Sequence, residues 1–327
     1  MATLADIRVK VRRLTRSLSE NQLTNDTLDD YINTFVLYDF PETLRLFTLK
    51  QTITFYTEPN IDTYATSAVP DSPLYEFKDR YITVHPPVYI GGSLSVFSQS
   101  REQFFSMYPQ VRSIKDTSLR GDGATTNFVG TLDQVPVLRN HVLFSSKDIN
   151  GEGLALRDNG FGDLINGMGG VAIIGSIDYV TGDFELNFPV APDNDEAINS
   201  QTVPYVPSKP MAMLYFNNEF TLRPVPDKVY PVSIDVYVRP TELLDSTAEP
   251  ELQQWWQYIA YGAAKKIFED RMDLESVQEI MPEFRNQEKL ILRRTLVQQS
   301  SQRTATIYSD ADDHNNHSGG WGWGGFF

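Results

Sequence analysis

Hydrophobic and polar positions alternate with a period of two near residue 235, which predicts a β-strand with one buried face. The Arg239-Pro240 step ends this strand, because proline cannot continue the hydrogen-bond ladder. A second strand is predicted just before it, from Thr221. The apolar positions are Val232, Ile234, Val236 and Val238, and the intervening positions are Ser233, Asp235, Tyr237 and Arg239.

The first 45 residues have helical periodicity instead. Apolar residues spaced by three and four predict an amphipathic helix over residues 3–19. A second helix is expected to begin at Thr27-Leu-Asp-Asp30, a capping-box-like sequence, and to end at Pro41. The apolar positions are Leu4, Ile7, Val11, Leu14 and Leu18 in the first helix, and Leu28, Tyr31, Ile32, Phe35 and Val36 in the second.

Helical periodicity returns after Pro250, where a helix can start. Gly262, Ala263 and Ala264 allow another helix to approach closely, and Pro282 predicts a kink or a restart in a further helix. With the N-terminal pair, this gives a bundle of about four helices drawn from both chain ends. The apolar stripes contain Leu252, Trp255, Trp256, Ile259, Ala263 and Ile267, then Phe284, Ile291 and Leu292.

The middle of the chain is predicted to be rich in β structure. Residues 46–60 and 74–98 indicate strands and turns, and residues 101–110 a short helical turn. From Thr117 to about Pro204 the chain is rich in Gly, Asn and Asp, and Tyr179–Asp183 is typical of a hairpin turn. We therefore expect an inserted all-β domain over residues 117–203.

Two motifs carry a resemblance to a known family. Leu222-Arg-Pro-x-Pro, the strand up to Pro240, and the helix with Tyr261-Gly-Ala-Ala264 resemble the head-to-tail adaptor (connector) proteins of tailed bacteriophages. Tyr31-Ile-Asn33 matches the second-helix motif of the same family. The resemblance covers roughly residues 1–45 and 205–300. Separately, the hairpin Gly175–Phe188 with Ala191-Pro192 is similar to a small β-sandwich module found in phage tail and neck proteins.

The expected fold is α+β, with a helical bundle from both chain ends, central β structure and an inserted β-sandwich-like domain. The expected segments are an N-terminal helical pair (1–45), a β-rich segment (46–116), the insert (117–203), adaptor strands (204–245), C-terminal helices (246–302) and an extended docking tail (303–327).

The resemblance implies a virion structural protein, a ring of about twelve copies located in the neck between capsid and tail. Such a ring joins the portal protein to tail, nozzle or lower neck proteins, and genomic DNA passes through it without sequence-specific binding. It is synthesised in the host cytoplasm and needs neither an enzyme activity nor a cofactor. A lower neck or tail-tube component shares almost every one of these sequence features. A different class remains open, a glycan-binding or hydrolytic tail-associated protein acting through the β-insert.

Composition narrows the classes of function. The chain has 327 residues, 41% of them hydrophobic, which allows a large core and about two domains. Its apolar runs are too short for a membrane span, and we expect a soluble, unprocessed protein without membrane contact. The absence of cysteine excludes disulfides, thiolate metal sites and cysteine nucleophiles. The net charge of −15 argues against tight nucleic-acid binding and suits either a DNA conduit that repels phosphate or simple solubility.

Three groups of residues are candidates for contacts. A basic cluster in the first helix is expected to face an acidic patch of a neighbouring subunit or of the portal, the DNA channel, or solvent. The aromatic residues of the glycine-rich C-terminal segment are expected to dock on the portal, and three further aromatic residues to anchor the bundle or an interface, with Trp256 buried and Trp255 nearer a neighbour. The groups are Arg8, Lys10, Arg12, Arg13 and Arg16; Trp321, Trp323, Phe326 and Phe327; and Trp255, Trp256 and Tyr31.

The sequence contains no strong enzyme motif, and with 43 acidic residues no pair stands out as acid and base. His314-x-x-His317 lies beside several aspartates but on a segment too glycine-rich to hold a metal geometry. Asp148-x-Asn150-x-Glu152 resembles the start of a calcium loop, yet Asn159 occupies the twelfth position, which favours a polar turn. We therefore predict no catalytic, cofactor or metal site.

Overall fold

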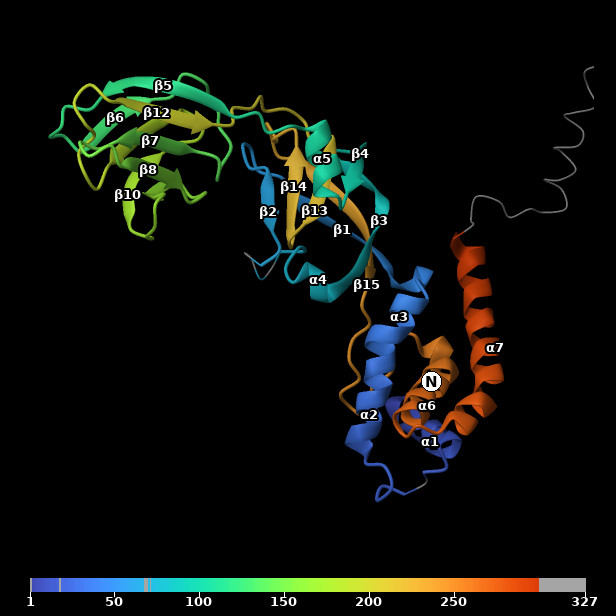
Figure 1. The fold of residues 1–327 in the computed structure, drawn as a ribbon. Coiled ribbons are helices and arrows are strands. Elements are labelled where there is room, and N and C mark those ends of the chain that lie inside the picture. Colours follow the sequence, from blue (N-terminus) through green and yellow to red (C-terminus); the bar gives the residue numbers. More distant parts are fainter. Residues whose placement is uncertain (1, 18, 68–69, 71, 300–327) are drawn as a thin grey trace, which may run out of the picture. The chain divides into compact units, whose positions relative to one another are not determined.

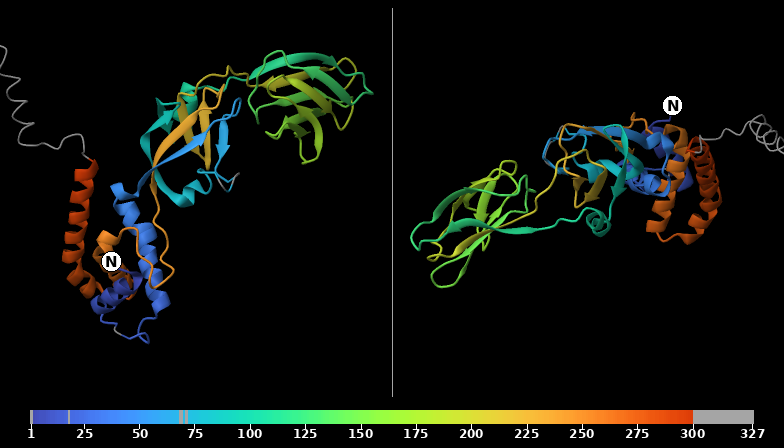
Figure 2. Two further views of the ribbon diagram at one scale, coloured as in Figure 1. Left: turned by 180° about the vertical axis from the view of Figure 1, so that it is seen from behind. Right: turned by 90° about the horizontal axis from the view of Figure 1, so that it is seen from above.

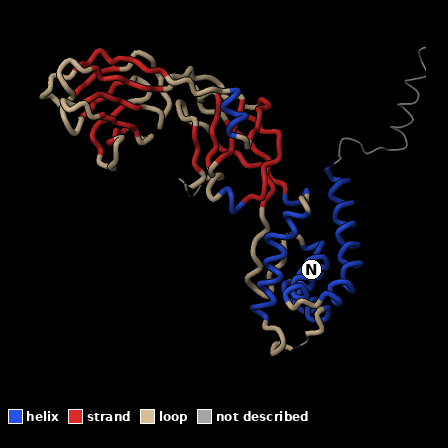
Figure 3. The backbone as a smooth tube through the Cα atoms, viewed as in Figure 1, coloured by secondary structure: helices blue, strands red, loops and turns tan. Residues whose placement is uncertain are grey.

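The computed structural model describes residues 2–17, 19–67, 70 and 72–299, and its fold is mixed α and β, as the sequence predicts (Figure 1). The chain forms two compact units. Unit 1 comprises the described residues of Met1–Gln51, Asp79–Val84 and Val236–Phe327, and unit 2 comprises those of Thr52–Lys78 and His85–Asp235. Figure 3 shows that the long helices belong to unit 1 and most of the strands to unit 2.

Unit 1 is built from helices of both ends of the described chain. Helix α6 contacts α1, α2 and α7, so it occupies the centre of this unit. The elements are α1 (Leu4–Leu14), α2 (Asn25–Thr34), the π-helical turn η1 (Phe35–Asp39), α3 (Phe40–Thr43), the 3₁₀ turns η2 (Phe47–Leu49) and η3 (Gln253–Trp255), α6 (Trp256–Asp270) and α7 (Leu274–Gln299).

One apolar core joins these helices. Leu4, Ile7 and Val11 of α1 are fully buried with Ile259 and Ala263 of α6, as their spacing predicts. Rings extend the core: the centroids of Phe40 and Tyr258 lie 4.9 Å apart, and those of Tyr258 and Phe284 4.8 Å apart. Leu292 of α7 is instead 41% exposed, so its expected place on the apolar side was wrong.

Gly262 sets the distance between α6 and the chain near Phe35. A β-carbon added at Gly262 would lie 2.2 Å from the Phe35 ring. The predicted close approach at this glycine is therefore confirmed, because any side chain would overlap the ring.

Three details of the N-terminal helices differ from expectation. Helix α1 ends at Leu14, with Thr15 as its C-cap, and does not reach the expected end at residue 19. The N-cap of α2 is Thr24, whose hydroxyl accepts the Thr27 N–H at 3.2 Å, so Thr27 lies inside the first turn. Pro41 does not end the helix, because the preceding turn is π-helical and the chain stays helical to Thr43. The Phe40 N–H donates to the Phe35 carbonyl five residues back, and this wider turn brings the chain into α3, which has Pro41 in its first turn. Similarly, α7 continues through Pro282.

The first sheet of the structure has seven strands in the order β1-β15-β3-β4-β13-β14-β2. Its edge strands are therefore β1 and β2. The strands are β1 (Lys50–Tyr56), β2 (Thr63–Ala65), β3 (Tyr81–Ile90), β4 (Ser93–Ser98), β13 (Ala212–Phe216), β14 (Glu219–Arg223) and β15 (Pro231–Val238). The short helices α4 (Phe77–Arg80) and α5 (Arg101–Met107) lie between its strands in the sequence, and α5 matches the predicted helical turn.

The strand pair recognised in the sequence is present, but its members do not pair with each other. β14 lies between β13 and β2, and β15 lies between β1 and β3. Val232, Ile234 and Val236 are fully buried, which confirms the alternation. Tyr237 departs from it, because it is buried in the core of unit 1.

The second sheet has eight antiparallel strands in the order β5-β12-β7-β8-β9-β10-β11-β6 and curls around its own apolar core (Figure 2). The expected β-sandwich is thus one continuous curled sheet in the described residues, not two stacked sheets. Its strands are β5 (Ser113–Arg120), β6 (Asn127–Thr131), β7 (Leu143–Lys147), β8 (Gly153–Asp158), β9 (Asp163–Asn166), β10 (Ile173–Ile177), β11 (Asp183–Asn187) and β12 (Ala197–Thr202).

The predicted hairpin is confirmed between β10 and β11. Ile177 pairs with Phe184, and the Asp178 carboxylate accepts the N–H groups of Val180 and Thr181 at 2.8 and 3.1 Å. Gly182 has a φ of +82°, the conformation that requires a glycine here. Whether residues 117–203 form a separate domain stays a prediction, since the contacts place the eight-stranded sheet and most of the seven-stranded sheet together in unit 2.

Candidate interaction sites

The basic cluster of α1 does not form a single charged surface. The Arg8 guanidinium forms a bidentate ion pair with Asp29 of α2, and both side chains are 18% exposed. This pairing raises the Arg8 pKa, mainly through the hydrogen bond to Asp29. Arg12 donates to the carbonyls of Ser17, Ser19 and Leu23 and to the Asn25 side chain, at 2.8–3.3 Å. Arg8 and Arg12 therefore stabilise unit 1 from within.

The other cations of the cluster are more accessible. The Lys10 ammonium lies 5.4 Å from the Tyr261 ring centroid, a cation–π distance. Arg13 is exposed. The Arg16 side chain is 86% exposed and lies 3.8 Å from Glu279, a contact that contributes little in water. Arg13 and Arg16 are thus the members of the cluster most available to another molecule.

The aromatic anchors lie in or beside the core of unit 1. Trp255 and Trp256 are both half-buried against this core. The expected difference, with Trp256 buried and Trp255 nearer a neighbour, is therefore not found in their burial. The Arg294 guanidinium lies 5.6 Å from the Trp255 ring centroid. The Tyr31 hydroxyl donates to Asp270, and this hydrogen bond is the main cause of a raised Tyr31 pKa. Tyr31 thereby ties α2 to the end of α6.

The C-terminal candidates lie outside the described residues. These are Trp321, Trp323, Phe326 and Phe327, together with His314 and His317. Their expected roles stay predictions.

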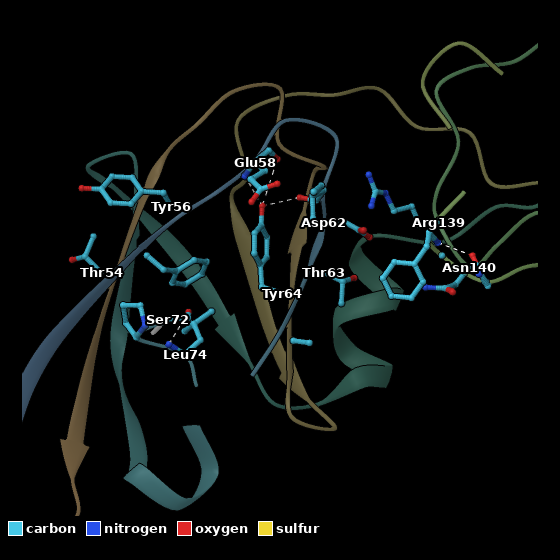
Figure 4. Close-up of a pocket in the computed structure, with 17 residues that line it drawn as sticks. Thr54, Tyr56, Glu58, Asp62, Thr63, Tyr64, Ser72, Leu74, Arg139 and Asn140 are labelled. Carbon is cyan, nitrogen blue, oxygen red and sulfur yellow. Dashed lines mark hydrogen bonds between the residues drawn. The ribbon is translucent and has the colours of Figure 1, made fainter. Parts of the chain in front are cut away.

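A cavity that the sequence analysis did not anticipate lies within unit 2 (Figure 4). Its volume is about 660 Å³. Residues from both edge strands of the seven-stranded sheet line it, together with loops from the eight-stranded sheet. Thr54 and Tyr56 lie on one side, and Arg139 and Asn140 on the other. Further lining residues are Phe55, Glu58, Ile61, Asp62, Thr63, Tyr64, Ala65, Leu74 and Phe161.

Tyr64 organises the wall of this cavity. Its hydroxyl accepts the Glu58 N–H at 2.8 Å and donates to the Ile61 carbonyl at 2.9 Å, and its ring lies 5.4 Å from Phe55. Burial raises the pKa of Tyr64, so the hydroxyl stays protonated and keeps both hydrogen bonds. The turn between β1 and β2 is thereby fixed to β2.

Only some of the polar groups at the cavity have a hydrogen-bond or ion-pair partner among the described residues. Arg223 forms a buried ion pair with Asp62 at 2.6 Å. The Arg139 Nε is buried and has no hydrogen-bond partner among the described residues, although its guanidinium lies 5.4 Å from the Tyr179 ring centroid. Two aromatic residues of the lining are largely exposed to solvent, Tyr56 to 65% and Phe161 to 88%. The cavity thus offers apolar surface and a free hydrogen-bond donor.

This cavity could not be read from the sequence, because its lining comes from segments that are distant along the chain. One signal was available, since Phe161 stands between Gly160 and Gly162, where an aromatic side chain has no helix or strand pattern to explain it.

The part of the chain that the structure describes contains no cluster of three potential His, Asp or Glu metal ligands. In the segment that resembles the start of a calcium-binding loop, the Asp148 carboxylate accepts hydrogen bonds from the N–H groups of Asn150 and Glu152, at 2.9 and 2.7 Å. It therefore serves a polar turn, as the sequence analysis favoured. Among the described helices, none is long and apolar enough to cross a membrane.

Comparison with known proteins gave no match, either to a protein-family model or to a curated protein.

Proposed function

We propose that the chain is a virion structural protein, a head-to-tail adaptor that forms a ring between the portal and the tail and lines the DNA exit channel. The observation that carries the proposal is the common core of α1, α2, α6 and α7, which unites the two segments with the family-like motifs. In this proposal these helices act as a four-helix bundle that packs subunits into the ring.

The buried parts of the motifs support this role. Asn33 of the Tyr31-Ile-Asn33 motif exchanges two hydrogen bonds of 3.0 Å with the Leu243 backbone, just after the Arg239-Pro240 motif. Helix α2 and the segment that follows β15 thus depend on each other. An adaptor needs such a rigid body because its subunits have to keep their register around the channel.

The proposal includes two contacts with other molecules. The exposed Arg13 and Arg16 face an acidic patch of a neighbouring subunit or the DNA. The C-terminal aromatic residues, which lie outside the described residues, dock on the portal. The net charge of −15 keeps DNA from adhering to the channel wall. Tail, nozzle or lower neck proteins bind on the side away from the portal.

Electron microscopy tests this proposal. The purified protein is imaged alone and after mixing with the portal protein from the same genome. A ring added to the tail-facing end of the portal is expected. Absence of association, with both proteins folded and at micromolar concentration, would contradict the adaptor role and favour a lower neck or tail-tube component.

A further inference from the structure

Among the described residues, no hydrogen-bond partner is found for the outward backbone groups of the edge strand β2. Thr66 N–H donates to the Asn218 carbonyl, and Leu222 N–H donates to the Asp62 carbonyl. Because antiparallel pairs alternate, Tyr64 also directs its N–H and C=O towards β14, where it pairs with Phe220. Thr63 and Ala65 therefore direct their N–H and C=O groups away from the sheet.

This free edge adjoins the apolar cavity. Thr63 and Ala65 line the cavity, as do Phe55 and Tyr56 of the other edge strand. An extended segment that hydrogen-bonded to β2 would place alternate side chains against this apolar surface. The buried Arg139 Nε adds one donor for a carbonyl or carboxylate of such a segment.

The chain contains a segment of matching chemistry. Residues 318–327 have the sequence SGGWGWGGFF, in which Trp321 and Trp323 are two residues apart and separated by a glycine. In a strand, both indole rings would lie on one face and the glycines would allow close approach to the edge. Three acidic residues, Asp310, Asp312 and Asp313, precede this segment and complement Arg139.

We propose that residues 318–327 add as a strand to the free edge of β2 in the same molecule, with Trp321 and Trp323 in the cavity of unit 2. The linker of residues 300–317 between Gln299 and this segment can span up to roughly 60 Å when extended. A tethered segment has an effective concentration of the order of millimolar, which favours the molecule's own tail over that of a second copy at micromolar protein. The inference goes beyond the proposed function, since it concerns the unassembled protein and requires no portal.

Hydrogen–deuterium exchange of the full chain, without the portal, tests this inference. The N–H groups of Thr63 and Ala65 should exchange slowly in the wild type and at least about tenfold faster in the W321A/W323A variant. Tyr64 is an internal reference, because its N–H is bonded to β14 and should stay protected in both. The matched control is H314A/H317A, which changes two side chains just before residues 318–327 without removing an indole, and it should keep the wild-type protection.

A second variant tests the edge itself. Ala65→Pro removes the N–H of Ala65, which points away from β14. Proline is tolerated at such an edge position, so the pairing of Tyr64 with Phe220 should be kept. Residues 318–327 should then lose protection against exchange. Equal exchange of Thr63 and Ala65 in wild type and W321A/W323A would overturn the inference. Protection that disappears on dilution would overturn it as well, since the occupant would then be the tail of a second copy.

Discussion

The helical core of unit 1 and the eight-stranded sheet of unit 2 are stabilised in different ways. In unit 1, segments more than 200 residues apart share one apolar core, and close packing at Gly262 sets the geometry. In the eight-stranded sheet, neighbouring strands pair in a meander over most of the sheet, and aspartates fix several turns. Packing errors should therefore damage unit 1 most, and loss of single carboxylates should affect the sheet locally.

The largest effect is expected for Gly262→Ala. The added β-carbon would lie 2.2 Å from the Phe35 ring, so the ring or α6 must move. Overpacking of this kind should lower the free energy of unfolding by about 2 kcal/mol, even after the gain in helix propensity. Urea unfolding followed by circular dichroism at a helical wavelength measures this loss.

The matched control is Gly153→Ala in β8, where no atom lies within 4 Å of the added β-carbon. Its unfolding midpoint should stay close to that of the wild type. If both variants unfold alike, close packing at Gly262 is not what holds α6 in place.

A smaller effect is expected for Arg12→Ala, which removes the donor to three backbone carbonyls of the segment after α1. The free energy of unfolding should fall by about 1–2 kcal/mol. Arg13→Ala, at an exposed neighbour on the same helix, should change it by less than about 0.5 kcal/mol. Thermal unfolding of the two variants distinguishes an internal role of Arg12 from a surface role of Arg13. Equal losses of stability would contradict this difference between the two side chains.

The smallest effect concerns the loop at Asp122. Hydrogen bonds from the Thr125 hydroxyl, and from the Thr125 and Ala124 N–H groups, lower the pKa of Asp122 to about 2. Because the folded pKa lies below the ordinary value of 3.8, the carboxylate stabilises the loop above that pH, and this stabilisation is lost as the pH falls towards 2.

An NMR titration of the Ala124 and Thr125 amides in the folded protein should therefore show a transition with its midpoint near the folded pKa of about 2, below the ordinary value of 3.8. Thr125→Val removes the hydroxyl, the main cause of the shift, and should move the transition to higher pH. A transition unchanged by this variant would show that the hydroxyl does not hold the carboxylate.

Local pattern explains what the sequence could predict. The spacing of Leu4, Ile7 and Val11 and the alternation around Ile234 identified their elements, because each element buries one face. The hairpin at Asp178 was equally readable, since glycine and aspartate are needed at defined turn positions.

Long-range arrangement explains what it could not predict. The helix through Pro41 depends on a π-helical turn that periodicity does not reveal. The basic cluster was interpreted as one group, yet Arg8 and Arg12 have partners on other segments that only the fold brings near. The cavity in unit 2 likewise requires the order of strands, which makes β2 an edge.

The common core of unit 1 also has a consequence for synthesis on the ribosome. Leu4 and Ile7 are made first, but Ile259 and Ile291, with which they form the core, follow some 250 residues later. At about 5–20 residues per second, the N-terminal apolar faces wait for roughly 10–50 s before the core can close. The eight-stranded sheet lies wholly within that interval, so it can fold first, while the early helices need shielding from aggregation.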